Sequence, residues 1–168
     1  MSCTIYLLRH GIAGPTPDGM TDADRQLTGT GERRMMKIAV GLKRLGVCPH
    51  AILSSPLLRA KQTADIVAPV LAPRCVVQLC EALAPGHHVA DVVRALGRRR
   101  RDIMLVGHEP DLGHLASFLL TGSVQQLSLQ FKKGGIAAIE VETLPPRGGT
   151  LLWLLTPKQL SRIAGGGG

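Results

Sequence analysis

The chain has 168 residues, of which 45% are hydrophobic and 19% are charged, a composition that suits one globular domain and disfavours intrinsic disorder. The 20 basic residues exceed the 12 acidic ones, which gives a net charge of +8 and favours an anionic substrate or partner. With 2 Phe, 1 Tyr and 1 Trp, the chain has too few rings to stack the bases of a single-stranded nucleic acid. We therefore expect no nucleic acid among its partners.

The sequence shows no sign of export or of membrane insertion. Its 4 cysteines are scattered without a C-x-x-C pair, and a chain of this length needs no disulfide bonds. The apolar run at residues 5–8 leads straight into Arg9, unlike a secretory signal. No apolar stretch reaches the roughly 18 residues that span a membrane. These features predict a soluble, cytoplasmic protein without a membrane partner.

The first half of the chain alternates predicted strands and helices. Residues 3–8 form a short apolar run of strand formers, and the glycines and prolines after it predict a loop. Apolar residues recur at helical spacing over residues 32–45. Residues 51–53 predict a second strand, and Ser55 and Pro56 are typical of the N-cap and first position of a helix. Two strand–helix units are therefore expected.

The second half continues this alternation and then changes to two consecutive strands. The expected elements are a strand at 74–79, a helix at 89–96, a strand at 103–106, a helix at 112–120, and strands at 136–141 and 151–155. Prolines and glycines connect the last two strands, which predicts an antiparallel hairpin. The order indicates an α/β fold, a three-layer α/β/α sandwich with a mixed, mostly parallel sheet. We expect one domain over residues 1–164 and a flexible glycine tail over 165–168.

Polar side chains follow three of the predicted strands. Arg9 and His10 follow the first strand, Arg59 lies in the first turn after the second, and His108 follows the strand at 103–106. The carboxyl ends of parallel strands meet at one edge of a sheet, so these side chains are expected to converge. Arginine forks bind phosphate oxygens, and a histidine with a free ring nitrogen can attack phosphorus. The sequence therefore predicts a site for phosphoryl chemistry.

Three motifs resemble those of the histidine phosphatase superfamily, the group that includes the phosphoglycerate mutases. Residues 7–11 (LLRHG) resemble its first motif, residues 54–64 (SSPLLRAKQTA) its second, and residues 106–110 (VGHEP) its third. The motifs occur in the family's order, and the whole chain is similar to the SixA-like phosphohistidine phosphatase branch. The resemblance implies a phosphoglycerate mutase-like fold.

The resemblance also implies a role for each site residue. His10 is expected to be the nucleophile that becomes phosphorylated, while Arg9, Arg59 and His108 bind the phosphoryl oxygens. We expect His10 to be neutral, with its second ring nitrogen donating to a carbonyl, and His108 to be protonated. No metal or other cofactor is expected, because the arginines supply the positive charge that a metal ion supplies elsewhere.

The residue that protonates the leaving group stays open at this point. Many members of the superfamily use an acidic residue, and Glu81, after the predicted third strand, is the positional candidate. Asp18, Asp22 and Asp24 lie in the loop after His10 and are its rivals, although charged loop residues are commonly solvated. Imidazole leaves far more readily than an alkoxide once it is protonated, so a phosphohistidine substrate needs less help from an acid.

The short intervals between the motifs leave no room for an insertion that caps the pocket. An open pocket admits a phosphate displayed on a protein surface, which favours a phosphatase acting on phosphohistidine in a signalling or phosphotransfer protein. One alternative is a phosphatase of a small phosphomonoester, such as a sugar or nucleotide phosphate. Another is a non-catalytic basic module that binds phosphorylated protein through this pocket or through the arginines at 98–101.

Overall fold

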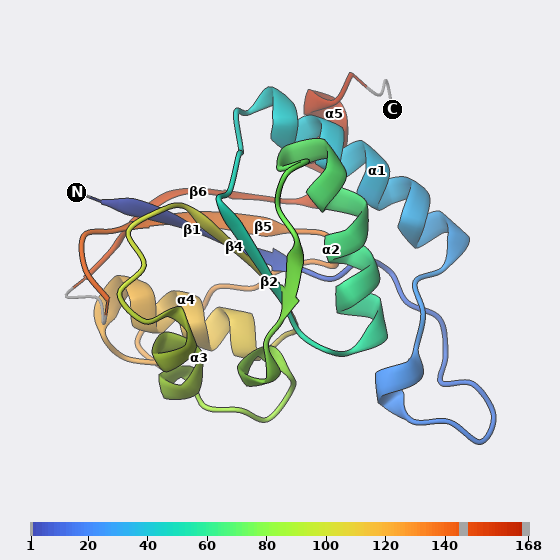
Figure 1. Ribbon diagram of the computed structural model, residues 1–168, viewed down its shortest axis with the longest axis horizontal. Helices are drawn as coiled ribbons and strands as arrows, with labels where there is room; N and C mark the ends of the chain where they lie inside the picture. Colours follow the sequence, from blue (N-terminus) through green and yellow to red (C-terminus); the bar gives the residue numbers. More distant parts are fainter. Residues whose placement is uncertain (1, 145–147, 166–168) are drawn as a thin grey trace.

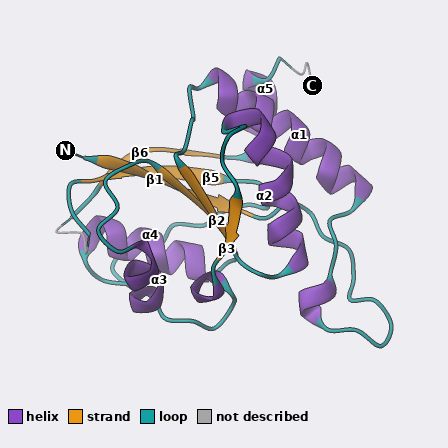
Figure 2. Cartoon of the chain, viewed as in Figure 1, coloured by secondary structure: helices purple, strands orange, loops and turns teal. Residues whose placement is uncertain are grey.

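The computed structural model describes residues 2–144 and 148–165, which contain one mixed sheet of 6 strands in the order β3-β2-β4-β1-β5-β6 (Figures 1 and 2). The strands are β1 (Cys3–Arg9), β2 (Ala51–Ser54), β3 (Val77–Leu79), β4 (Ile103–Gly107), β5 (Ile136–Val141) and β6 (Thr150–Leu155). The first four run parallel, whereas β5 is antiparallel to both of its neighbours. The predicted mixed, mostly parallel sheet is confirmed.

Helices cover both faces of this sheet. The helices are α1 (Gly29–Arg44), α2 (Leu58–Leu71), α3 (Val89–Leu96), α4 (Asp111–Thr121) and α5 (Pro157–Ile163). The apolar sides of α1, α2 and α5 form a core with one face, and those of α3 and α4 form a second core with the other. Along β1, Tyr6 and Leu8 enter the first core while Ile5 and Leu7 enter the second, because successive strand residues face opposite ways. The three-layer α/β/α sandwich is confirmed.

The start of α2 differs from the prediction. Ser55 was expected to cap the helix and Pro56 to be its first residue, but Leu57 is the N-cap and the helix begins at Leu58. The backbone N–H of Ser55 donates to the Val106 carbonyl at 2.9 Å, so Ser55 extends the pairing of β2 with β4. A residue held in extended pairing cannot begin a helix, and the turn at Pro56 is therefore longer than predicted.

Other boundaries also shift. β3 begins at Val77 rather than at residue 74, because the backbone turns first, with the Cys75 N–H donating to the Ala72 carbonyl at 2.8 Å. The helix α5 was not predicted, although Thr156 caps it and Pro157 occupies its first turn. Of the expected connection between β5 and β6, residues 145–147 lie outside the described residues, as do residues 166–168 of the expected glycine tail.

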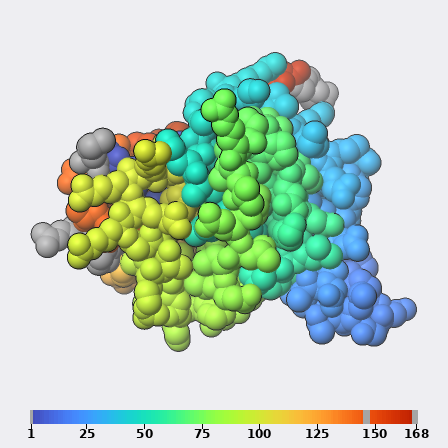
Figure 3. Space-filling view, viewed as in Figure 1, coloured from blue at the N-terminus to red at the C-terminus, as the bar shows by residue number. Residues whose placement is uncertain are grey.

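A long loop connects β1 to α1 and carries a 3-10 turn, η1 (Asp22–Asp24), that was also not predicted. An isolated bridge between Ala13 and Leu27 closes the base of this loop. The Gly14 N–H reinforces it by donating to the Gln26 carbonyl at 2.9 Å. In Figure 3 the loop forms the blue projection that stands out from the body of the molecule. None of the three residues of η1 is buried.

Candidate active site

The carboxyl ends of β1, β2 and β4 meet as predicted, and His10 lies at their centre. It follows β1 directly and is 5% exposed. Its Nδ1 lies 2.7 Å from the carbonyl oxygen of Gly11, and because a carbonyl only accepts, Nδ1 is the donor. The neutral ring therefore carries its hydrogen on Nδ1 and has a lone pair on Nε2, the arrangement that a nucleophile requires.

The surroundings of His10 keep it neutral. Burial is the largest cause that lowers its pKa, the Gly11 hydrogen bond opposes it, and the positive charges of Arg59 and Arg9 add to the lowering, so that the pKa lies at about 4. A neutral imidazole at neutral pH has an unprotonated Nε2 whose lone pair can attack an electrophile.

Arg59 lies in the first turn of α2, is 5% exposed, and points at His10. Its Nε donates to His10 Nε2 at 3.3 Å. The hydroxyl of Thr63, one turn along α2, links this arginine to the loop after β1, because it donates to the Arg59 carbonyl at 2.7 Å and accepts from the Gly11 N–H at 3.0 Å. This pair of hydrogen bonds fixes α2 relative to the segment that carries His10.

Arg9, the last residue of β1, contributes a second guanidinium. Its Nη1 donates to the carbonyl oxygen of Phe131 at 2.7 Å. Its Nε is buried and has no hydrogen-bond partner among the described residues. Buried donors are normally paired, so an unpaired one in the site of His10 marks a place for an acceptor that arrives with a ligand.

His108 follows β4 and is 3% exposed. Its ring lies with its centroid 5.1 Å from that of His10, at an interplanar angle of 53°, and its Nε2 is 2.7 Å from the Ser55 hydroxyl. Its Nδ1 is the second buried atom that lacks a partner among the described residues. The structure thus brings His10, Arg9, Arg59 and His108 together, with two unpaired nitrogens facing no protein acceptor.

His108 is expected to be protonated as the charge partner of a phosphoryl group, whereas its surroundings in the structure lower its pKa. Burial, the largest cause, together with the neighbouring His10 and Arg59 lowers its pKa to about 3, although Asp22 acts to raise it. His108 is therefore neutral at neutral pH when no phosphoryl group is bound. A bound phosphoryl group would bring negative charge next to the ring and raise its pKa.

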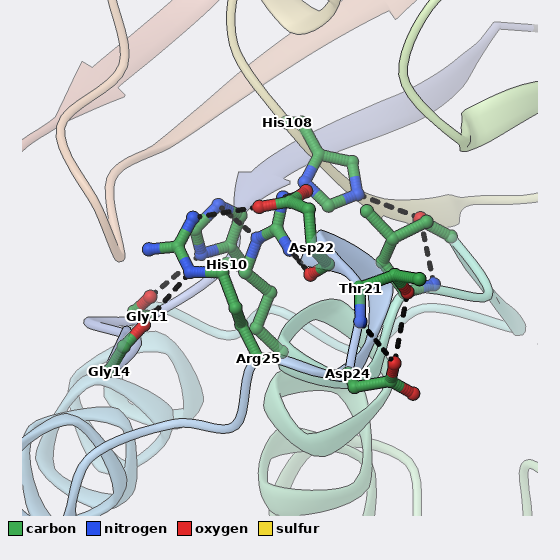
Figure 4. Close-up of polar contacts among 11 residues, drawn as sticks. His10, Gly11, Gly14, Thr21, Asp22, Asp24, Arg25 and His108 are labelled. Carbon is green, nitrogen blue, oxygen red and sulfur yellow. Dashed lines mark hydrogen bonds and ion pairs between the residues drawn. The ribbon is translucent and has the colours of Figure 1, made fainter. Parts of the chain in front are cut away.

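The carboxylates of the candidate proton donors lie in different places. Glu81 opens the 3-10 turn η2 (Glu81–Leu83) and is exposed, and within the described residues it makes no hydrogen bond or ion pair with the four site residues. Asp24 bonds to Thr21 in its own turn. Asp22 instead contacts the site, because its Oδ2 accepts from Arg59 Nη2 at 3.0 Å. Figure 4 shows Asp22 beside His10 and His108.

Sequence reasoning assigned no site contact to Ser55 or Arg25. Ser55 occurs in the second motif, but its position after a strand gave no sign that its hydroxyl meets His108. Arg25 comes to the site through the fold of the loop, where its Nε donates to the Gly14 carbonyl at 2.8 Å and its Nη1 pairs with Asp22 at 3.1 Å. A sequence pattern alone does not show such a contact, because it depends on how the loop closes.

A pocket of about 130 Å³ opens on one side of His108. Its walls are mainly apolar side chains and histidines from η2, the loop before α3, α3 and α4, including Leu83, His87, His88, Val92, Leu112 and His114, together with Asp111. No group of three or more His, Cys, Asp or Glu residues in the described parts of the chain is placed to hold a metal ion. Across the same residues, no helix is long and apolar enough to cross a membrane.

Comparison with known proteins places these features in a family. A model of the histidine phosphatase superfamily (branch 1) matches residues 5–85. An uncharacterized protein of Picosynechococcus is 40% identical over 140 residues, which cover 80% of this chain and 83% of that protein. Phosphohistidine phosphatase SixA of Escherichia coli is 29% identical over 161 residues, covering 93% of this chain and 95% of SixA.

Solved structures agree with these matches. The structure of protein histidine phosphatase SixA complexed with tungstate superimposes on this one with a TM-score of 0.80 at 26% identity. The match covers 94% of this chain and 99% of the SixA chain. A mycobacterial glucosyl-3-phosphoglycerate phosphatase with inorganic phosphate shares the fold at a TM-score of 0.68 and 18% identity, covering 93% of this chain and 99% of its own. From the motifs, the fold and these relatives together, we conclude that the chain belongs to the histidine phosphatase superfamily, in its SixA-like branch.

Proposed function

We propose that this protein is a phosphatase that works through a phosphohistidine at His10 and removes phosphate from histidine on a signalling or phosphotransfer protein. One observation carries the proposal. The unprotonated Nε2 of a neutral, buried His10 shares a site with two buried nitrogens, Arg9 Nε and His108 Nδ1, that have no partner among the described residues. These are the groups that a phosphoryl oxygen would engage.

In the first step, Arg9, Arg59 and His108 bind the phosphoryl oxygens while His10 Nε2 attacks phosphorus in line. The bond from phosphorus to the leaving atom breaks, and its electron pair stays with the leaving group. In phosphohistidine the leaving atom is an imidazole nitrogen, which departs as a neutral ring when the other nitrogen carries a proton. Positive charge and positioned donors then stabilise the transition state.

In the second step, water attacks the phosphorus of the phosphorylated His10. The phosphorus–nitrogen bond breaks, its electron pair returns to Nε2, and the attacking water loses a proton to the surrounding solvent. The Gly11 carbonyl holds the Nδ1 hydrogen throughout, at 2.7 Å, so the same tautomer is restored for the next cycle. Apart from this water and the solvent that takes its proton, the groups used in both steps belong to this chain, and its arginines supply positive charge.

The substrate class is supported by the relatives and by the form of the site. Proteins named SixA match this chain over nearly their full length, and they are named for action on phosphohistidine. The pocket beside His108 has about 130 Å³ of space and walls of apolar side chains, histidines and Asp111, which suits an imidazole leaving group. The same pocket also suits the second candidate function, a phosphatase of a small phosphomonoester, to which the glucosyl-3-phosphoglycerate phosphatase relative adds support.

The test is phosphate release from three substrates, a histidine-phosphorylated protein, a phosphoserine peptide and an aryl phosphate, all in EDTA. Wild type is compared with His10→Ala and with His50→Ala, which removes an exposed histidine outside the site. We expect preferential loss of phosphohistidine that requires His10 and not His50.

Each other result has a clear meaning. Rapid aryl phosphate hydrolysis with phosphohistidine untouched would select the small-ester phosphatase. Full activity of His10→Ala, or loss of wild-type activity in EDTA, would overturn the mechanism. No phosphate release from any of the three substrates would favour the non-catalytic binding module.

A further inference from the structure

The buried guanidinium of Arg59 is already occupied by an anion that the chain itself supplies. Asp22 Oδ2 accepts from Arg59 Nη2 at 3.0 Å, and the Asp22 backbone carbonyl accepts from Nη1 at 2.9 Å. The remaining nitrogen, Nε, faces His10 Nε2 at 3.3 Å. Every nitrogen of the fork is therefore engaged before any phosphoryl group arrives.

The two partners of this ion pair differ in their exposure. The Arg59 side chain is 7% exposed, whereas that of Asp22 is 59% exposed. The carboxylate thus reaches the buried arginine from the solvent side, the side from which a substrate must also come. Figure 4 shows the Asp22 side chain between the turn that carries it and the two histidines.

A second arginine keeps Asp22 charged and in place. Arg25 Nη1 lies 3.1 Å from Asp22 Oδ1, and this hydrogen bond is the largest of the effects that lower the Asp22 pKa. The negative charge of Asp22 also acts on His108, because it raises the pKa of that ring. Asp22 therefore presents an ionised carboxylate at the place where the phosphoryl oxygens are expected to bind.

The segment that carries Asp22 can withdraw without exposing the core. No residue of η1 is buried, and the contacts of Asp22 with Arg59 and Arg25 are polar and can be replaced by water. Opening of the turn would break few apolar contacts, which is the condition for a local movement of low free-energy cost.

We propose that Asp22 is an internal competitor for Arg59, a carboxylate that the phosphoryl group must displace and that returns when phosphate leaves. The proposal rests on the proposed function of the site and adds a residue that sets its affinity. The apparent dissociation constant for phosphate equals the intrinsic constant divided by the fraction of molecules whose Arg59 is free. Asp22 thereby weakens the binding of product phosphate and favours its release.

The test is the affinity for inorganic phosphate, measured by calorimetry at constant ionic strength without any turnover. We compare wild type with Asp22→Asn, which keeps the shape of the side chain, and with Asp22→Ala. The matched control is Asp18→Asn, which removes the same charge from an exposed position of the same loop. We expect both Asp22 variants to bind phosphate about 5-fold more tightly, from the usual strength of such an ion pair, and Asp18→Asn to match wild type.

A purely structural role for Asp22 predicts the opposite sign, because an arginine released from its support would bind phosphate less well. Weaker or unchanged affinity in both Asp22 variants would therefore overturn the proposal. Equal tightening in Asp18→Asn would also overturn it, by showing a general effect of loop charge. Thermal unfolding of each variant confirms that it is folded.

The result is separable from the test of the proposed function. Phosphate affinity does not depend on which phosphorylated substrate is hydrolysed or on attack by His10. If the protein shows no phosphohistidine phosphatase activity but Asp22→Asn binds phosphate more tightly, the proposed function is wrong and the role of Asp22 as a competitor stands. If the protein hydrolyses phosphohistidine but Asp22→Asn does not bind phosphate more tightly, the proposed function stands and the role of Asp22 is wrong.

Discussion

His10 and His108 give up favourable hydration to lie inside the domain, and this ties folding to pH. Burial lowers the His10 pKa from 6.5 to about 4 and the His108 pKa from 6.5 to about 3. From the lowered pKa of each histidine up to pH 6.5, the unfolded chain binds more protons than the folded one. The free energy of unfolding therefore rises with pH over this range. We expect the free energy of unfolding to lose nothing to these two histidines above pH 6.5 and to fall as the pH drops toward 4. Urea denaturation at several pH values measures this change.

The control for this pH effect is His10→Asn, which removes one of the two titrating groups. Its free energy of unfolding should fall less steeply between pH 6.5 and pH 4 than that of wild type. A slope identical to that of wild type would show that His10 does not have the lowered pKa on which its proposed role as nucleophile depends.

The hydroxyl of Ser55 positions His108, since it lies 2.7 Å from Nε2. The variant Ser55→Ala should lose about 5- to 10-fold in kcat, the usual effect of one hydrogen bond of about 1 kcal/mol, with KM little changed. The control is Ser54→Ala, because the buried Ser54 hydroxyl bonds instead to the Ser55 carbonyl at 2.9 Å. Steady-state kinetics of both variants would contradict this role if their losses in kcat were equal.

At the scale of elements, α1 and α5 approach each other closely at a glycine. A Cβ at Gly41 would lie 2.3 Å from the carbonyl oxygen of Leu160. The variant Gly41→Ala should therefore push α5 away from α1 and lose about 1–3 kcal/mol of stability, measured by urea denaturation.

Gly29, in the first turn of the same helix, provides the matched control. A Cβ there would meet the end of the flexible Arg33 side chain at 3.3 Å. Gly29→Ala should leave stability unchanged or raise it slightly, because alanine restricts the unfolded chain more than glycine does. Similar losses in both variants would show that the loss at Gly41 does not come from the close approach of α5.

The sequence predicted the elements whose signals are local. The order of strands and helices, the sheet with its antiparallel end, and the meeting of His10, Arg59 and His108 all follow from hydrophobic spacing and from residues placed after strands. The helix α5 was missed even though Thr156 and Pro157 carried a start signal, because it is only 7 residues long and shows little periodicity.

What could not be predicted depends on contacts between distant segments. The helix start at Leu58 is set by pairing of Ser55 with Val106 on another strand. The contact of Asp22 with Arg59 joins residues 37 positions apart, and it exists because a loop folds back over α2. The protonation of His108 is a property of burial, which a residue's neighbours in the sequence do not determine.

At the scale of the whole molecule, the excess of positive charge favours an anionic protein partner. The net charge is +8, and the arginines at 98–101 are exposed. Attraction between exposed charges is screened by salt. Raising the NaCl concentration from 0.05 M to 0.3 M should therefore lower kcat/KM for an acidic phosphohistidine protein by about 3- to 10-fold.

An aryl phosphate serves as the comparison in this experiment, because it contacts the pocket and none of the surrounding surface. Its kcat/KM should change less with salt than that of the phosphorylated protein. Equal salt dependence for the two substrates would show that the surface charge does not guide the partner and that screening acts in the pocket alone.

The backbone around His10 is tied into the middle of the sheet. The Arg9 N–H donates to the Gly135 carbonyl at 3.0 Å, the His10 N–H donates to the Gly107 carbonyl at 3.1 Å, and the Gly134 N–H reaches the carbonyls of Arg9 and His10 at 3.1 Å. Amides held in this way exchange with solvent deuterium through opening of the whole domain, whereas those of a projecting loop exchange through local opening. We therefore expect the amide of His10 to exchange far more slowly than those of the exposed turn η1, so that the two sides of the candidate site would open on different time scales.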